Sequence, residues 1–169
     1  MILYTPTRFD SNEWFVICAS LTCWSAVLVK PARMPVVVWF GIWLFNVFLA
    51  QTVDFMVAEK PWNLYDINDH PQYEWFDVFL YALVYPPAGL LVIQIYKRLA
   101  PLGWRIVPYL ILCASATLFL EWLSVLTGVF HYRGWQLAYS LPSYFAAYAL
   151  NVAVYRYFMR CIHQDVDHR

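Results

Sequence analysis

Residues 35–57 read PVVVWFGIWLFNVFLAQTVDFMV and contain one charged side chain, that of Asp54. A helix of this length can cross the roughly 30 Å hydrocarbon core of a lipid bilayer. The rest of the chain has the same character, since 62% of all residues are hydrophobic and 13% are charged. Soluble domains carry about 25% charged residues. The composition therefore predicts an all-α, polytopic membrane protein whose surface faces lipid.

Four further apolar segments flank this stretch, and we interpret all five as membrane-spanning helices. Polar breaks rich in Lys, Arg, Pro and Gly, or in Asp, Glu and Asn, separate them. No Gly/Ser-rich linker or internal repeat divides the chain, so residues 1–169 are expected to form one domain. The fold class is thus a bundle of about five transmembrane helices, predicted over residues 14–29, 35–57, 76–96, 105–130 and 136–159.

Basic residues fall unevenly on the two sides of this predicted bundle. The positive-inside rule places the richer side in the cytoplasm. We therefore expect a multi-pass protein of the cell membrane, with its N-terminus outside and its C-terminus in the cytoplasm. The richer side holds Lys30, Arg33, Lys97, Arg98, Arg105, Arg156, Arg160 and Arg169, and the other holds Arg8, Lys60 and Arg133.

Several classes of function lack support in the sequence. The formal net charge is zero, which argues against nucleic acid as a partner, because phosphate binding needs a basic face. The four cysteines have no metal-ligand spacing, so no metal site is predicted. No motif indicates a particular cofactor. The expected partners are the lipid bilayer and, given the small size, other membrane subunits or further copies of this chain.

Polar and small residues recur at helical spacing on four of the predicted spans. Membrane helices use such residues to pack closely and to form hydrogen bonds with one another. We therefore expect these four polar stripes to face the interior of the bundle. They consist of Asn46, Ala50 and Asp54; of Asp77 and Tyr81; of Thr117, Glu121, Ser124 and Gly128; and of Ser140, Ser143, Ala147 and Asn151.

Three carboxylates, Asp54, Asp77 and Glu121, are expected in the outer half of the membrane. An acid at this depth is costly unless it is paired, protonated or hydrated. Glu121 lies deepest and has no Lys or Arg at its own level, so its partners are hydroxyls, aromatic N–H groups, water, a cation or a ligand. These acids are the candidates for ligand binding or catalysis. The other predicted ligand-binding residues are Tyr81, Ser124, His131, Tyr132, Trp135 and Ser140.

Part of the chain resembles a family of small Trp/Tyr-rich membrane proteins, found chiefly in spore-forming bacteria, whose function is uncharacterised. The resemblance rests on PWNLY at 61–65, Asp77, Pro86, Glu121, GVFHYRGW at 128–135 and Ser140. It implies a bacterial protein of four or five helices, and it implies no activity. A fainter likeness to the lycopene-cyclase-type helical domain lacks that domain's paired Glu residues, since Pro142 is followed by Ser143 and Tyr144.

Three functions remain open at this point. The first is an outward-facing, carboxylate-lined cavity that binds a small ligand, a proton or a cation, with the chain acting as an accessory subunit of a membrane complex. The second is a membrane enzyme that acts on an isoprenoid or another lipid, with Glu121 as general acid beside Asp54 or Asp77. The third is a structural assembly factor whose carboxylates only join helices.

Overall fold

The computed structural model describes residues 3–29, 31, 33–69 and 73–167. It is almost entirely helical, which confirms the predicted helical bundle. Two short strands, β1 (Tyr65–Ile67) and β2 (Phe130–Tyr132), are the exceptions within the described chain. The helical elements are α1 (Ser11–Val29), α2 (Val36–Ala58), α3 (Trp75–Phe79), the π turn η1 (Leu80–Val84), α4 (Tyr85–Leu99), the 3₁₀ turn η2 (Gly103–Arg105), α5 (Ile106–Leu126) and α6 (Leu137–Asp167).

Four helical stretches of the described chain are long and apolar enough to cross a membrane. They are Ser11–Val29, Val36–Ala58, Trp75–Leu99 and Gly103–Leu126, and they correspond to the first four predicted spans. The fifth predicted span, 136–159, lies in α6, which is the longest helix. This helix is not among the four, and it carries polar residues along its length, including Asn151, Arg156 and Arg160.

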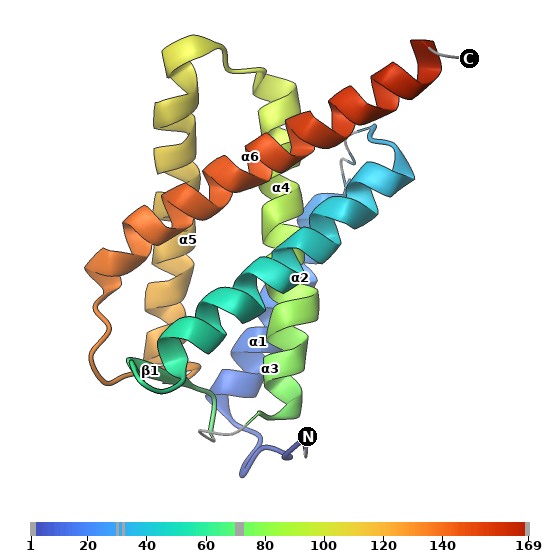
Figure 1. The fold of residues 1–169 in the computed structure, drawn as a ribbon. Helices are drawn as coiled ribbons and strands as arrows, with labels where there is room; N and C mark the ends of the chain where they lie inside the picture. The colour runs from blue at the N-terminus through green and yellow to red at the C-terminus, as the bar shows by residue number, and fades with distance from the viewer. Residues whose placement is uncertain (1–2, 30, 32, 70–72, 168–169) are drawn as a thin grey trace.

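Helix α4 lies in the middle of the bundle, where it contacts α1, α2 and α6, while α5 packs against α6 (Figure 1). The long helices alternate in direction along the chain. As a result, β1 and the N-terminal segment lie at one end of the molecule, and the η2 turn and the end of α6 lie at the other (Figure 1). The main core fills the space between these helices, with Ile42, Leu90, Ile93 and Ala114 fully buried.

The contact between α2 and α4 depends on a glycine. A Cβ atom added to Gly89 would lie 2.4–2.5 Å from the side-chain atoms of Asn46, which is too close for any other residue. The two Asn side chains of α2 and α6 then pair across the interface. The Asn46 amide donates to Asn151 Oδ1 at 2.7 Å, and the Asn151 amide donates to Asn46 Oδ1 at 3.0 Å. Both side chains are buried, so this pair joins α2 to α6.

The prediction that the fourth span continues as a helix to residue 130 is wrong, because α5 ends at Leu126. Gly128 follows it with a φ of +83°, in the left-handed region that suits glycine. The N–H of Gly128 then donates to Val125 O, and that of Val129 to Ser124 O. These two bonds form a Schellman motif, which ends a helix and turns the chain away from its axis.

The chain released by this turn forms β2, which pairs antiparallel with β1 from the connection between α2 and α3. Tyr65 lies opposite Tyr132, and Ile67 lies opposite Phe130. The all-helical prediction contained no strand here. This two-stranded ribbon covers one end of the helical bundle (Figure 1).

The third predicted span, 76–96, is not one regular helix. It is divided into α3, the π turn η1 and α4, with Pro86 and Pro87 in the first turn of α4. Proline has no N–H group and its ring collides with the preceding turn, so a helix changes its hydrogen bonding just before it. The wide π turn accommodates this change in hydrogen bonding, so the helical path from α3 continues through α4 to Leu99.

Candidate functional site

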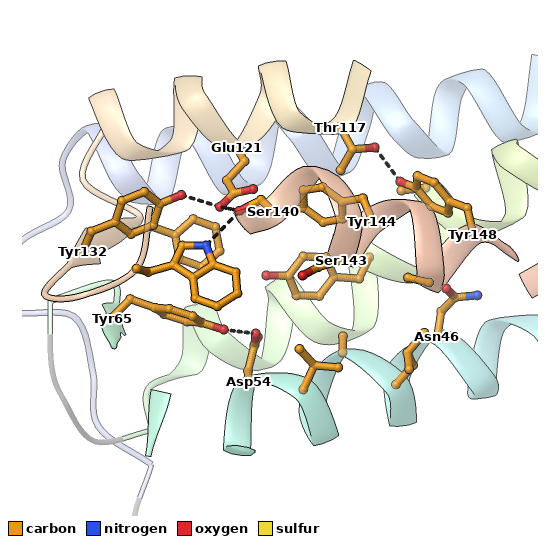
Figure 2. A pocket seen from close by; sticks show the side chains of 18 residues that line it. Asn46, Asp54, Tyr65, Thr117, Glu121, Tyr132, Ser140, Ser143, Tyr144 and Tyr148 are labelled. Atoms are coloured by element: carbon orange, nitrogen blue, oxygen red, sulfur yellow. Dashed lines mark hydrogen bonds between the residues drawn. The ribbon is translucent and has the colours of Figure 1, made fainter. Parts of the chain in front are cut away.

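The polar stripes of α2, α5 and α6 face one another around a cavity of about 170 Å³ (Figure 2). Most residues of these three stripes line the cavity, as expected, whereas Ser124, Gly128 and Asn151 do not. Ser143 lines it at an exposed position of α6. The ribbon of strands β1 and β2 covers one end of the cavity. The lining residues are Asn46, Leu49, Ala50, Val53, Asp54, Tyr65, Tyr85, Ala88, Thr117, Glu121, Phe130, Tyr132, Trp135, Ser140, Ser143, Tyr144, Ala147 and Tyr148.

Glu121 enters the cavity from α5 and is 7% exposed. Its Oε1 atom accepts hydrogen bonds from the hydroxyl of Tyr132 and, at 2.7 Å, from Ser140 Oγ. The Trp135 ring N–H donates to the same serine oxygen at 2.8 Å, which fixes the serine for its bond to the acid. The other oxygen, Oε2, is buried and has no hydrogen-bond partner. One oxygen of Glu121 is thus held firmly while the other stays open.

Asp54 enters from α2 with the same arrangement (Figure 2). The Tyr65 hydroxyl donates to Asp54 Oδ1 at 2.5 Å. The second oxygen, Oδ2, is buried without a hydrogen-bond partner. Two carboxylates from different helices therefore line one cavity, and each has one oxygen held by a tyrosine hydroxyl. The hydroxyls of Tyr81 and Tyr144 also interact with Asp54 and Glu121, respectively.

The β ribbon supplies both tyrosines. Because Tyr65 and Tyr132 are direct cross-strand partners, their side chains leave the ribbon on the same face. Burial, and then the charge of Asp54, raises the pKa of Tyr65 above its usual range. Burial, and then the bond to Glu121, does the same for the pKa of Tyr132. Both hydroxyls therefore keep their protons near neutral pH and act as donors to the carboxylates.

Among the described residues, no basic side chain lines the cavity, and the carboxylates that line it are those of Asp54 and Glu121. The ion pair of the ribbon, between Arg133 and Asp66 at 2.5 Å, involves neither of them. A buried charge without a partner is strongly unfavourable. The cavity is thus suited to a positively charged occupant or to a proton shared with the carboxylates.

Comparison with known proteins gives no relative, since no protein-family model, no curated protein and no solved structure matches this chain. The resemblance to a family from spore-forming bacteria therefore stays a prediction. The chemistry of the cavity is argued from its own residues.

Asp77 lies apart from the other two predicted acids. It lies in the first turn of α3, where its carboxylate accepts hydrogen bonds from Asn68 Nδ2 at 2.7 Å and from the Glu74 N–H at 2.8 Å. With Tyr81 it lines a second cavity, of about 540 Å³, which shares Asp54 and Tyr65 with the first. The structure therefore brings Asp54 and Glu121 together and places Asp77 in the neighbouring space.

Two further predicted site residues do not line the main cavity. The Ser124 hydroxyl donates to the backbone carbonyl of Glu121 at 2.6 Å and so serves the helix itself. His131 is exposed on β2, and its cross-strand partner is Asp66. Tyr132, Trp135 and Ser140, by contrast, all contribute to the hydrogen bonds around Glu121.

Sequence reasoning did not identify several of the aromatic residues that line the cavity. A signal was available for Tyr144 and Tyr148, since they follow Ser140 at steps of four along α6. The Tyr148 hydroxyl is 2.5 Å from Thr117 Oγ1, a residue of the predicted stripe on α5. Tyr65 gave no local signal, because its role depends on pairing with a strand far along the chain.

A second group of acids lies outside the cavity, near the start of α3. Glu74 is completely buried there, and burial raises its pKa to about 7, with further contributions from the charges of Asp77, Asp69 and Glu13. Asn12 Nδ2 donates to Asp69 Oδ1 at 3.1 Å and so joins α1 to this group. Glu74 therefore titrates close to neutral pH.

Proposed function

We propose that this chain is a multi-pass membrane protein whose cavity binds a small cation, which includes a proton, an inorganic monovalent ion or an ammonium compound. One observation carries this proposal. Asp54 and Glu121 line the same cavity, each keeps one buried oxygen without a partner, and no basic residue of the described chain shares the lining. A monovalent cation beside the two carboxyls would neutralise one of the two buried charges and so offset much of the cost of burying them.

Membrane insertion is supported by where the apolar side chains lie. Large hydrophobic residues project outward from the four long apolar helices, as with Phe48 at 67% and Leu112 at 70% exposed. Apolar surface of this extent is unfavourable in water and favourable in lipid. With the basic residues of the η2 end in the cytoplasm, the cavity would lie towards the outer face.

The proposal is tested by linkage between cation binding and thermal stability. A cation that binds only the folded protein raises its melting temperature as the cation concentration rises. The full chain in an uncharged detergent would be melted in increasing sodium, potassium and ammonium chloride, and at decreasing pH. We expect a rise in melting temperature in at least one series, and we expect Glu121→Gln and Asp54→Asn each to remove a response to sodium, potassium or ammonium and to reduce a response to pH.

The matched control is Asp10→Asn, which makes the same charge change at an exposed position outside both cavities. It should keep the response of the original chain. If Glu121→Gln and Asp54→Asn melt with the same dependence on cations and pH as the original chain, the carboxylates only join helices and the proposal is wrong.

A further inference from the structure

Aromatic rings form a large part of the walls of the main cavity. Rings reach it from the ribbon, from α4 and from α6, and they surround the two carboxylates. Tyr65 contacts the edges of Phe130 and Trp135, with ring centres 5.7 and 5.9 Å away, and Tyr144 stacks on Tyr148. The faces and edges of these rings form one part of the cavity wall. The ring-bearing residues besides Tyr132 are Tyr65, Tyr85, Phe130, Trp135, Tyr144 and Tyr148.

This lining distinguishes between kinds of cation. Calcium takes six to eight oxygen ligands and magnesium takes six. No group of three or more His, Cys, Asp or Glu side chains in the described chain could hold a metal ion. Aromatic rings, by contrast, attract cations whose charge is spread over apolar substituents, because the face of a ring carries negative electrostatic potential.

The size of the cavity also favours a cation with apolar substituents over a bare metal ion. A volume of about 170 Å³ exceeds the share of a single water molecule, which is about 30 Å³. A bare metal ion would leave most of this space empty or filled with water against apolar rings. An ammonium group with small alkyl substituents would fill it and contact both the rings and the acids.

We infer that the occupant is a substituted ammonium ion, whose charged nitrogen lies beside the carboxyl groups of Asp54 and Glu121 and whose alkyl groups lie against the aromatic rings. This inference rests on the proposed function and names the class of cation. The tyrosine hydroxyls of the ribbon hold one oxygen of each carboxylate, and the other oxygen of each is buried without a hydrogen bond. The ammonium group belongs either to a free amine or to the head group of a lipid.

Choline and its uncharged carbon analogue, 3,3-dimethylbutan-1-ol, test the inference directly because they have nearly the same shape. Binding to the purified full chain in an uncharged detergent would be followed by calorimetry and by tryptophan fluorescence, since Trp135 lines the cavity. We expect choline to bind at least about tenfold more tightly than the alcohol, as loss of the charge removes both the ionic and the cation–π attraction.

Three variants separate the contributions. Glu121→Gln should weaken choline binding about tenfold or more, whereas Asp10→Asn should leave it unchanged. Phe130→Leu removes a ring but keeps an apolar side chain, and it should weaken choline while it leaves the much weaker binding of the alcohol nearly unchanged. A melting curve of each variant confirms that it is folded.

The outcomes distinguish this inference from the proposed function. Equal binding of the alcohol and choline would overturn the ammonium assignment in favour of an apolar ligand. Sodium, potassium or calcium that displaces choline at equal concentration would also overturn it, but would leave cation binding in place. Absence of any response to cations or pH that depends on Glu121 and Asp54 would remove both proposals.

The source of the ammonium group is resolved in lipid nanodiscs. Discs of phosphatidylglycerol alone contain no ammonium head group, so free choline should bind as it does in detergent. If a lipid head group is the natural ligand, addition of phosphatidylcholine to the discs should weaken the apparent affinity for free choline. An unchanged affinity would assign the site to a free amine.

Discussion

Tyr65 and Tyr132 each form a hydrogen bond to only one of the two oxygens of a cavity carboxylate. One oxygen accepts a hydrogen bond from the tyrosine hydroxyl, and the other is buried without a hydrogen-bond partner. A hydrogen bond to a charged acceptor is stronger than one between neutral groups, so each acid is fixed in orientation before any ligand arrives. At the level of single residues, the two carboxylates therefore have the fixed orientation that the proposed cation binding needs.

Gly89 gives a prediction at the same scale. Gly89→Ala places a methyl group against the Asn46 side chain, and overpacking of this kind costs about 1–3 kcal/mol. We expect a lower melting temperature for the full chain in detergent, by several degrees.

A double-variant cycle checks the cause. Asn46→Ala removes the atoms with which the new methyl group collides, so Gly89→Ala should cost much less in that background than alone. Equal costs in both backgrounds would mean that the glycine matters for another reason.

Glu74 gives a pH-dependent prediction. Burial, and then the charges of Asp77, Asp69 and Glu13, raises its pKa from 4.5 to about 7 in the folded chain, so between these values the folded state binds more protons than the unfolded state. Stability from this group is therefore complete below pH 4.5 and is lost as the pH rises through about 7. Glu74→Gln stays neutral and should reduce the fall in melting temperature between pH 5 and 8. Asp10→Asn should retain it, and an unchanged slope in Glu74→Gln would contradict this account.

The ribbon and the helix end before it are the elements that complete the site. Gly128 adopts a left-handed conformation that costs other residues about 1–2 kcal/mol, and the bonds of its Schellman motif direct the chain into β2. Gly128→Ala should lower the melting temperature and shift the fluorescence of Trp135, whose ring bonds to Ser140.

Gly103 supplies the control for this prediction. It also has a positive φ, of +56°, and a Cβ added there would meet nothing within 4 Å. Gly103→Ala should therefore cost a similar amount of stability without any change at the cavity. A fluorescence shift in both variants would indicate a general loosening of the bundle.

Elements with a local signal could be predicted from the sequence, and elements that depend on distant pairing could not. Apolar runs gave the helices, and helical spacing placed Asp54 and Glu121 on inward faces, because both patterns lie within one segment. The strands were missed because three residues each are too short for a recognisable period. Asp77 lies in the first turn of its helix and accepts a bond from the Glu74 N–H, and no local pattern indicates which of the two cavities it lines.

At the scale of the whole molecule, the alternating helices place the two ends of the bundle on opposite sides of any membrane that it crosses. The described basic residues at the η2 end include Arg33, Lys97 and Arg98, while Arg8, Lys60 and Arg133 belong to the ribbon end. The proposed orientation therefore predicts a cytoplasmic C-terminus. Reporter fusions after Arg169 and an inserted tag beside Trp62 should report opposite sides. Both signals on one side would contradict a five-span topology.

Side chains of β2 alternate between the two faces of the ribbon. A change in the length of the segment before β2 therefore affects the site differently when it is an odd number of residues than when it is an even number. Tyr132 faces the cavity, whereas its neighbours His131 and Arg133 belong to the opposite face, where Arg133 pairs with Asp66. A single-residue insertion or deletion between Gly128 and Phe130 exchanges the two faces of β2 if the pairing is kept. It would bring a basic side chain towards Glu121 in place of a phenol, so a change in length would act as a change in charge.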